Sequence, residues 1–270
     1  MKSLNAAHRL ALSGTPVENR LEDLRSLFDF AIPGYLGASA DFKREWRVPI
    51  EVNRDAEKAK RLKRVTGPFL LRRLKTDRSI IDDLPEKVEI DEYAKLSGEQ
   101  AALYEGIVQK GLEDAAAADS QADRRALVLK LITSLKEVCD HPRVYDKESP
   151  PEAALSGKCG LLLSLLEEIL EGREKVIVFS QYVETLRLLK SVIEKELSEE
   201  SLLYHGGMSK KERDLAVDRF QNEAAQRVFL VSLKAGGLGL NLTAASRVIH
   251  YDLWFNPAVE SQATDRAFRI

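Results

Sequence analysis

The second half of the sequence alternates short apolar runs with amphipathic stretches, and this alternation limits the fold more than any other feature. Four uninterrupted apolar runs have the length of a β-strand, at 176–179, 202–204, 228–231 and 248–251. The segments between them, 183–197 and 209–220, repeat apolar residues at helical spacing. Strands that are apolar on both faces and joined by helices form parallel sheets with right-handed crossovers. The pattern therefore predicts an α/β fold in which helices flank a parallel sheet.

Two prolines mark a boundary in front of this region. Pro150 and Pro151 stop both helices and strands, and the pattern of apolar residues changes after them. Between residues 96 and 140, leucines recur at spacings of three and four, which is typical of helices. We therefore predict a mainly helical region before residue 150 and the α/β domain over 151–270.

Composition excludes several classes of protein. Of the 270 residues 44% are apolar and the net charge is −2, which argues against a disordered chain and against a polycation that coats nucleic acid. Two cysteines cannot cross-link a chain of this size, and no apolar run is long enough to span a membrane. We expect a soluble intracellular protein with no membrane partner, located in the cytoplasm or nucleoid of a prokaryote or in the nucleus of a eukaryote.

Two charged segments of the helical region need interpretation. Residues 41–78 hold 13 Lys and Arg against 6 Asp and Glu, a local charge of +7, whereas the rest of the chain carries −9. This basic segment fits a solvated helix face and a phosphate-contacting face about equally well. Further along, Val88 and Ile90 alternate with Glu89 and Asp91, which indicates a half-exposed strand rather than an acidic magnesium motif.

Several motifs that would bind a cofactor are incomplete. Gly157-Lys158 is the only Gly-Lys pair, but Glu152 stands where a Walker loop needs its first glycine. A dinucleotide-binding turn at 237–239 would place its third glycine at Leu242. The four histidines and two cysteines have no spacing that suits a metal. We therefore predict neither a P-loop nor a metal site in this chain.

Polar and glycine residues follow the apolar runs. Gln181 follows the first run, Gly206 and Gly207 follow the second, and Lys234 with a group of glycines follows the third. The carboxyl ends of parallel strands are where open α/β sheets bind ligands, and free amides beside a lysine attract phosphate there. Ordinary helix capping explains the first two turns about equally well when each is taken alone.

An arginine pair lies near the end of the sequence. Arg266 and Arg269 are three residues apart, so on a helix they would project from the same face. Two adjacent guanidinium groups suit a polyphosphate whose charge shifts as its terminal group leaves. The alternative is a solvated helix face of aspartate and arginine.

Several blocks in a fixed order make the chain resemble the Swi/Snf family of superfamily 2 helicase-like ATPases, enzymes that move along double-stranded DNA. Besides the segments above, the blocks are LALSGTP at 10–16, FLLRR at 69–73 and VCDHP at 138–142. The resemblance implies a RecA-like second helicase lobe over 151–270, which clamps ATP against a first lobe. It also implies a first-lobe remnant over 1–30, with a strand at 10–15 that lacks its sheet, and a helical protrusion and linker over 31–150.

The resemblance further implies roles for individual residues. The motif that couples the nucleotide site to DNA would be Ser13, Gly14, Thr15 and Pro16. The DNA-backbone contacts of the second lobe would be Gln181, Gly206, Gly207, Ser232, Lys234, Ala235 and Gly236. Gly239 and Gln262 would line the nucleotide cleft between the lobes, and Arg266 and Arg269 would be its arginine fingers.

We therefore expect the chain to be the carboxyl-terminal half of an ATP-driven double-stranded DNA translocase that uses ATP and Mg²⁺ in its full-length form. Without a Walker loop, the chain alone should hold neither and should not hydrolyse ATP. Its expected partners are duplex DNA, the missing first lobe and DNA-bound protein complexes. Two alternatives remain open: a non-catalytic nucleic-acid or protein-binding module derived from a helicase lobe, and a fragment of a superfamily 2 RNA helicase.

Overall fold

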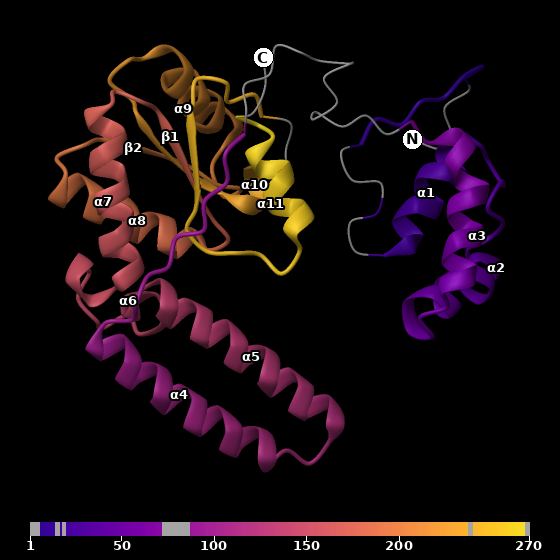
Figure 1. The fold of residues 1–270 in the computed structure, drawn as a ribbon, viewed down its shortest axis with the longest axis horizontal. Helices are drawn as coiled ribbons and strands as arrows, with labels where there is room; N and C mark the ends of the chain where they lie inside the picture. The colour runs from indigo at the N-terminus through magenta and orange to yellow at the C-terminus, as the bar shows by residue number, and fades with distance from the viewer. Residues whose placement is uncertain (1–5, 14–16, 18–19, 72–86, 237–239, 268–270) are drawn as a thin grey trace. The chain divides into compact units, whose positions relative to one another are not determined.

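A computed structural model describes residues 6–13, 17, 20–71, 87–236 and 240–267 of the chain (Figure 1). The chain divides into two compact units, Met1–Asp83 and Leu84–Ile270. Among the described residues, no helix combines the length and the apolar character needed to cross a membrane. The domain boundaries predicted at residues 30 and 150 remain predictions.

The first unit is a small cluster of helices around one apolar core. Its elements are α1 (Leu21–Ala31), α2 (Ser39–Phe42), the π-helix η1 (Lys43–Val52), α3 (Ala56–Thr66) and the 3-10 helix η2 (Gly67–Phe69). The buried core side chains are Leu24, Phe28, Leu36, Phe42, Trp46 and Leu62. The cationic groups of Lys58 and Arg61 lie 5.6 and 5.7 Å from the centre of the Trp46 ring. Part of the basic segment therefore covers a buried aromatic side chain, while Lys63 and Arg64 face solvent.

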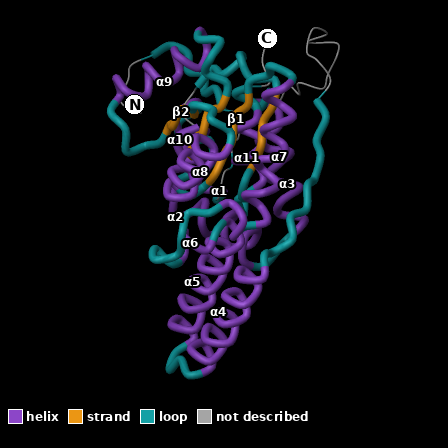
Figure 2. Tube along the Cα trace, turned by 90° about the vertical axis from the view of Figure 1, so that its left-hand side faces the viewer, coloured by secondary structure: helices purple, strands orange, loops and turns teal. Residues whose placement is uncertain are grey.

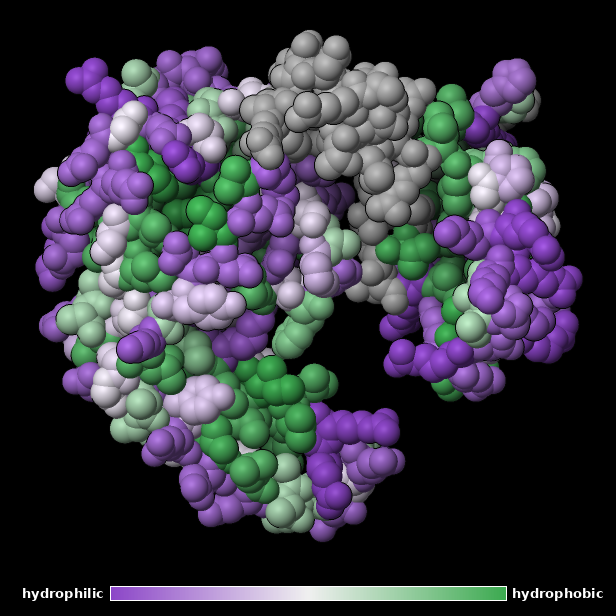
Figure 3. Space-filling model, in the orientation of Figure 1, coloured by the Kyte–Doolittle hydropathy of each residue, from purple (hydrophilic) through white to green (hydrophobic). Residues whose placement is uncertain are grey.

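The second unit begins with a long helical hairpin, α4 (Gly98–Ala116) and α5 (Gln121–Asp140). Ser97 and Ser120 start the two helices, because each side chain accepts a backbone N–H of the first turn. A Cβ atom on Gly111 would lie 2.6 Å from Cδ1 of Leu131, so glycine permits a close approach of the helices. A cavity of about 340 Å³ also lies between them, and apolar side chains gather over the hairpin (Figure 3).

Two buried polar side chains join the base of the hairpin to the helix α7 (Gly157–Glu171). The side-chain amide of Gln100 donates to the Val138 carbonyl at 2.7 Å and accepts the Gly157 N–H at 3.1 Å. Asp140 forms an ion pair with Lys158 at 2.8 Å. The Gly-Lys pair seen in the sequence therefore serves the attachment of the hairpin.

A parallel four-stranded sheet forms the centre of the second unit. The strands are β1 (Val176–Ser180), β2 (Ser201–Tyr204), β3 (Val228–Ser232) and β4 (Arg247–His250). The helices among them are α8 (Val183–Glu196), α9 (Lys210–Asn222), α10 (Leu233–Gly236) and α11 (Pro257–Thr264), and the short elements α6 (Pro142–Tyr145) and η3 (Ala153–Leu155) precede α7. The strand order is β2-β3-β1-β4 and every neighbouring pair is parallel. Figure 2 shows the strands of this sheet together with the helices of the unit. This arrangement confirms the predicted α/β fold.

Alternate residues of the strands face two separate apolar layers. Val176 and Val178 of β1 belong to the layer that contains Leu166 of α7 and residues of α8. Ile177 belongs to the opposite layer, with Phe220 of α9. All five side chains are fully buried, and burying one such side chain stabilises the fold by about 1.5–3 kcal/mol. The two layers hold the sheet firmly, so the turns that follow its strands start from fixed positions.

Two predicted strands are absent from the described part of the chain. Residues 87–97 contain no strand, and Val88 and Ile90 are 76% and 73% exposed. Residues 10–13 likewise form no strand, and the rest of that block lies outside the described residues. Both predictions are wrong where they can be checked, because an alternating or apolar pattern forms a strand only beside a partner strand.

Candidate functional site at the carboxyl edge of the sheet

The parallel sheet brings the predicted DNA-contacting turns to one edge. Ser180 at the end of β1 pairs with Ser232 at the end of β3, and Tyr204 at the end of β2 pairs with Val231. Residues 181, 205–207 and 233–236 therefore all leave the sheet at its carboxyl edge, on neighbouring strands. This juxtaposition is the one that the sequence predicts.

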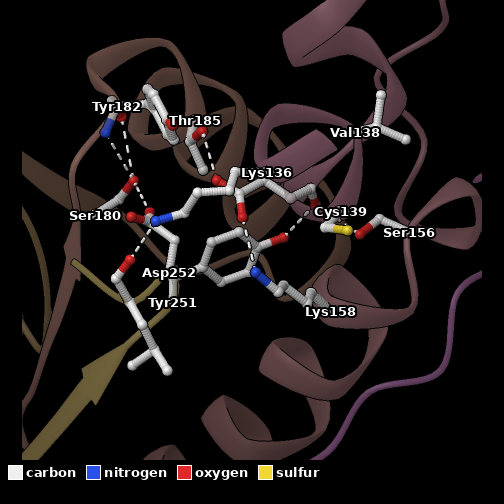
Figure 4. A network of polar contacts seen from close by, with 12 residues as sticks. Lys136, Val138, Cys139, Ser156, Lys158, Ser180, Tyr182, Thr185, Tyr251 and Asp252 are labelled. Atoms are coloured by element: carbon white, nitrogen blue, oxygen red, sulfur yellow. Dashed lines mark hydrogen bonds and ion pairs between the residues drawn. The ribbon is translucent and has the colours of Figure 1, made fainter. Parts of the chain in front are cut away.

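The turn after β1 is held by a buried carboxylate that the sequence analysis missed. Asp252 is 1% exposed. Its two carboxylate oxygens accept the Gln181 backbone N–H at 3.1 and 3.2 Å, and the Ser180 hydroxyl donates to the same carboxylate (Figure 4). The available signal was position, since Asp252 directly follows the fourth apolar run just as Ser180 and Gln181 follow the first.

The side chain of Gln181 has an unsatisfied donor. Gln181 is half-buried, and its Nε2 atom is buried without a hydrogen-bond partner among the described residues. A buried polar group left without a partner costs about 1–3 kcal/mol, so a rotation of the side chain that brings Nε2 to an acceptor on a ligand would be favourable. A phosphate oxygen is such an acceptor.

The turn after β2 exposes main chain beside a capped helix. The Gly207 N–H donates to Nδ1 of His205 at 3.1 Å, and a Cβ atom on Gly206 would meet nothing within 4 Å. The space next to Gly206 is therefore open to a ligand. Ser209 and Glu212 satisfy each other's backbone N–H at the start of α9, which confirms the predicted capping box.

Among the residues described directly after β3, one side chain is exposed. Ser232 and Ala235 are 3% and 2% exposed, so contacts from these two residues to a ligand would use the main chain. Lys234 is exposed, and its Nζ lies 5.9 Å from the centre of the Trp254 ring. Gly236 ends the short helix α10 that follows the strand. Lys234 thus brings a positive charge to this edge.

The residues predicted for the nucleotide cleft are partly described. Gln262 is half-buried on α11, while Gly239 and Arg269 lie outside the described residues. Arg266 follows the end of α11 in a turn, and its carbonyl accepts the Leu242 N–H at 2.9 Å. This bond places Arg266 against Leu242, in the segment that follows Gly239 in the sequence. Helix α11 ends at Thr264, so Arg266 does not lie on the helix face that its spacing from Arg269 would allow.

The predicted coupling motif falls mostly outside the described residues. Ser13 is described and exposed, whereas Gly14, Thr15 and Pro16 are not described. No group of three or more metal-binding side chains occurs in the part of the chain that the structure describes.

A second buried carboxylate, Asp140, joins the hairpin to the same region. Burial raises the pKa of Asp140 to about 7, although the nearby ammonium of Lys158 opposes this shift. The Asp140 carbonyl accepts the hydroxyls of Ser156 and Tyr251, each at 2.7 Å. Tyr251 directly precedes Asp252, so the end of α5 is bonded to the loop that holds the Gln181 turn (Figure 4).

The neighbouring His141 is structural. It is fully buried, its Nδ1 accepts the Arg143 N–H at 3.1 Å, and its Nε2 therefore donates to the Glu152 carbonyl at 2.9 Å. Burial lowers the pKa of His141, so the ring is held neutral and both nitrogens are used by the main chain.

Comparisons with known proteins agree with the resemblance seen in the sequence. The SNF2-related domain matches residues 1–144, and the helicase conserved C-terminal domain matches residues 158–270. YwqA of Bacillus subtilis (strain 168) is 46% identical over 272 residues, an alignment that covers 100% of this chain and 29% of that protein. SWI/SNF-related matrix-associated actin-dependent regulator of chromatin subfamily A member 1 of Mus musculus is 35% identical over 279 residues, covering 100% of this chain and 26% of that protein.

Solved structures show the same likeness. The Sulfolobus solfataricus SWI2/SNF2 ATPase core in complex with dsDNA is 38% identical, with a TM-score of 0.62 over 96% of this chain and 54% of that chain. The likeness confirms the predicted RecA-like fold. This chain spans less than a third of the two curated relatives named above. On the matches that run through both halves of its sequence, the chain belongs to the SNF2 family.

Proposed function

We propose that this chain is the carboxyl-terminal part of an ATP-dependent translocase of double-stranded DNA, and that its sheet edge binds the phosphate backbone. The observation that carries the proposal is the carboxyl edge itself. Three groups lie there at the ends of neighbouring strands: the unsatisfied side-chain amide of Gln181, the open main chain at Gly206 and the exposed Lys234. These groups offer donors and positive charge but no base-reading geometry.

In this proposal the residues divide into four groups. The DNA-backbone contacts are Gln181, Gly206, Gly207, Ser232, Lys234, Ala235 and Gly236. Gly239 and Gln262 line the ATP site, Arg266 and Arg269 stabilise the phosphate that is transferred, and Ser13 to Pro16 couple ATP to DNA. The Leu242–Arg266 bond supports the grouping of the ATP site with the arginines, since it joins the segment that follows Gly239 to Arg266.

The nucleotide would need a partner lobe. The sequence has no Walker loop, so we propose that a first RecA-like lobe elsewhere in the protein holds ATP and Mg²⁺ and that this chain alone does not hydrolyse ATP. DNA-bound protein complexes are further proposed partners, and a DNA substrate would place the protein inside the cell. Measurable ATP turnover by the isolated chain in a clean preparation would overturn the statement that this chain alone does not hydrolyse ATP.

The DNA proposal is tested by fluorescence anisotropy with labelled duplexes of unrelated sequence. The chain should bind them with similar affinity, and binding should weaken steeply with salt because phosphate contacts release counterions. Lys234→Met keeps the aliphatic stem near Trp254, and it should weaken binding to all duplexes and reduce the salt slope by about one. Lys195→Ala, at the exposed end of α8, is the matched control and should change neither. Salt-insensitive, sequence-selective binding would contradict the proposal.

The arginine assignment is tested in a polypeptide that also carries the first lobe. Arg266→Ala should reduce DNA-stimulated ATP turnover about a thousandfold, with a much smaller effect on ATP affinity. Unchanged turnover would reject the assignment. Stimulation by RNA instead of duplex DNA would favour an RNA helicase, and binding without any turnover would favour a non-catalytic module.

A further inference from the structure

Asp252 is a buried acid with an unusual set of partners. It is 1% exposed, and no ion pair reaches it among the described residues. The hydrogen bonds that reach it from the described residues all come from one turn, through the Ser180 hydroxyl and the Gln181 backbone N–H. A buried carboxylate without a cation costs stability, so this arrangement needs a reason other than stabilising the sheet.

The bonds of Asp252 fix the backbone from which the Gln181 side chain extends. Asp252 holds the Gln181 N–H from one side, and the Ser180 hydroxyl oxygen accepts the Tyr182 N–H at 3.1 Å. Both amides of the turn therefore depend on the Asp252–Ser180 pair. The unsatisfied Nε2 of Gln181 lies on the same residue, so this pair fixes the backbone from which that side chain extends.

Asp252 is itself held on both sides by α5. The Tyr251 hydroxyl donates to the Asp140 carbonyl at 2.7 Å. On the other side, Nζ of Lys136 donates to the Leu253 carbonyl at 2.5 Å and lies 4.4 Å from the centre of the Phe255 ring. Three consecutive residues, 251 to 253, thus connect α5 to the Gln181 turn (Figure 4).

We propose that Asp252 is a positioning residue for DNA binding, which orients the side-chain amide of Gln181 toward a backbone phosphate. The inference rests on the proposed function. Asp252 acts through Gln181 and does not touch DNA, because its carboxylate is buried and bears the same sign of charge as phosphate.

This role and simple electrostatics predict opposite results. Removing a negative charge near a polyanion should strengthen binding by Coulomb attraction alone, whereas loss of positioning should weaken it. Asp252→Asn keeps the shape of the side chain, and it should weaken duplex affinity about five- to tenfold, the effect of one misdirected hydrogen bond to a charged group. Asp214→Asn, on the exposed surface of α9, removes an equal charge and should leave affinity unchanged or slightly increased.

A double-mutant cycle tests whether Asp252 acts through Gln181. Gln181→Ala should weaken duplex affinity about tenfold, and Asp252→Asn should add almost nothing to it when the two changes are combined. Neither change should alter the salt slope, since neither residue neutralises a phosphate. In the wild-type chain the backbone N–H of Gln181 should be protected from hydrogen exchange. Asp252→Asn should abolish much of that protection, as followed by NMR.

The outcomes separate the two proposals. If the wild-type chain fails to bind duplex DNA at low salt, the proposed function fails and the inference with it. If wild type binds and Gln181→Ala weakens binding, two results for Asp252→Asn would overturn the inference alone. One is unchanged duplex affinity. The other is a loss of affinity that is as large in the Gln181→Ala background as in the wild-type chain. If Asp252→Asn does not fold by circular dichroism, Ser180→Ala replaces it, because that change removes one anchor of the turn; unchanged affinity would then overturn the inference.

Discussion

Replacement of Asp140 by asparagine should remove a large part of the pH dependence of stability. Asp140 is fully buried at the base of the hairpin, and burial raises its pKa from 3.8 to about 7 despite the Lys158 ammonium at 2.8 Å. The folded protein therefore binds a proton that the unfolded chain has already released between these two pH values. Stability from this group is fully present below pH 3.8 and is lost as the pH rises through about 7.

The size of the effect follows from the shift. A difference of about three pKa units corresponds to about 4 kcal/mol between the limits of low and high pH. From pH 5 to pH 8 the linkage relation gives a loss of about 3 kcal/mol in the free energy of unfolding. Asp140→Asn is uncharged at every pH and keeps the shape of the side chain, so its stability lacks this term.

Urea unfolding at pH 5, 6, 7 and 8 measures the effect. Trp46 lies in the first unit, so a Trp46→Phe background leaves Trp254 to report on the second unit by fluorescence. The free energy of unfolding of the parent minus that of Asp140→Asn should fall by about 3 kcal/mol across this range. Glu167→Gln, an exposed acid on α7, is the control and should run parallel to the parent. A difference for Asp140→Asn that stays constant within about 1 kcal/mol would refute the reasoning.

Three further predictions concern packing, capping and reactivity. Leu166→Ala should lower the free energy of unfolding by about 2–5 kcal/mol in urea, since Leu166 is fully buried between α7 and the sheet; a loss below 1 kcal/mol would contradict the packing described. Ser209→Ala should cost about 1 kcal/mol through loss of the capping box, measured in the same way, and no loss would argue against the cap. Cys159 is buried and its pKa is raised to about 12, so native protein should alkylate Cys139 first and Cys159 only in urea, as read by mass spectrometry; equal rates would contradict its burial.

The sheet could be predicted because its strands are apolar on both faces. Short runs of consecutive apolar residues, such as 176–179 and 228–231, are typical of strands that are buried on both faces. Strands that are joined by helices pair in parallel. The common edge of the turns then follows from topology alone. The alternation of Val88 and Ile90 with charged residues was misleading. A strand with one apolar face forms only beside a partner strand, and the described residues supply none.

The parts of the candidate site that escaped prediction depend on contacts between distant segments. Asp252 lies 71 residues from Gln181 in the sequence, so no local pattern connects them. Asp140 was visible within the VCDHP block, but its ion pair with Lys158 and its bond from Tyr251 require the folded arrangement. Lys234, by contrast, was recognisable because an exposed cation among glycines is a local feature.

The attachment of the hairpin base determines how the long helices can move. Gln100 and Asp140 use buried hydrogen bonds that water cannot replace cheaply, so bending at the base would break several of them together. The hairpin must then turn rigidly with the sheet. Its arm is about 30 Å long at 1.5 Å per residue, so turning the sheet by about 10° would sweep the far tip through about 5 Å. A small rotation of the sheet would thus move the far tip of the hairpin by more than the length of a hydrogen bond.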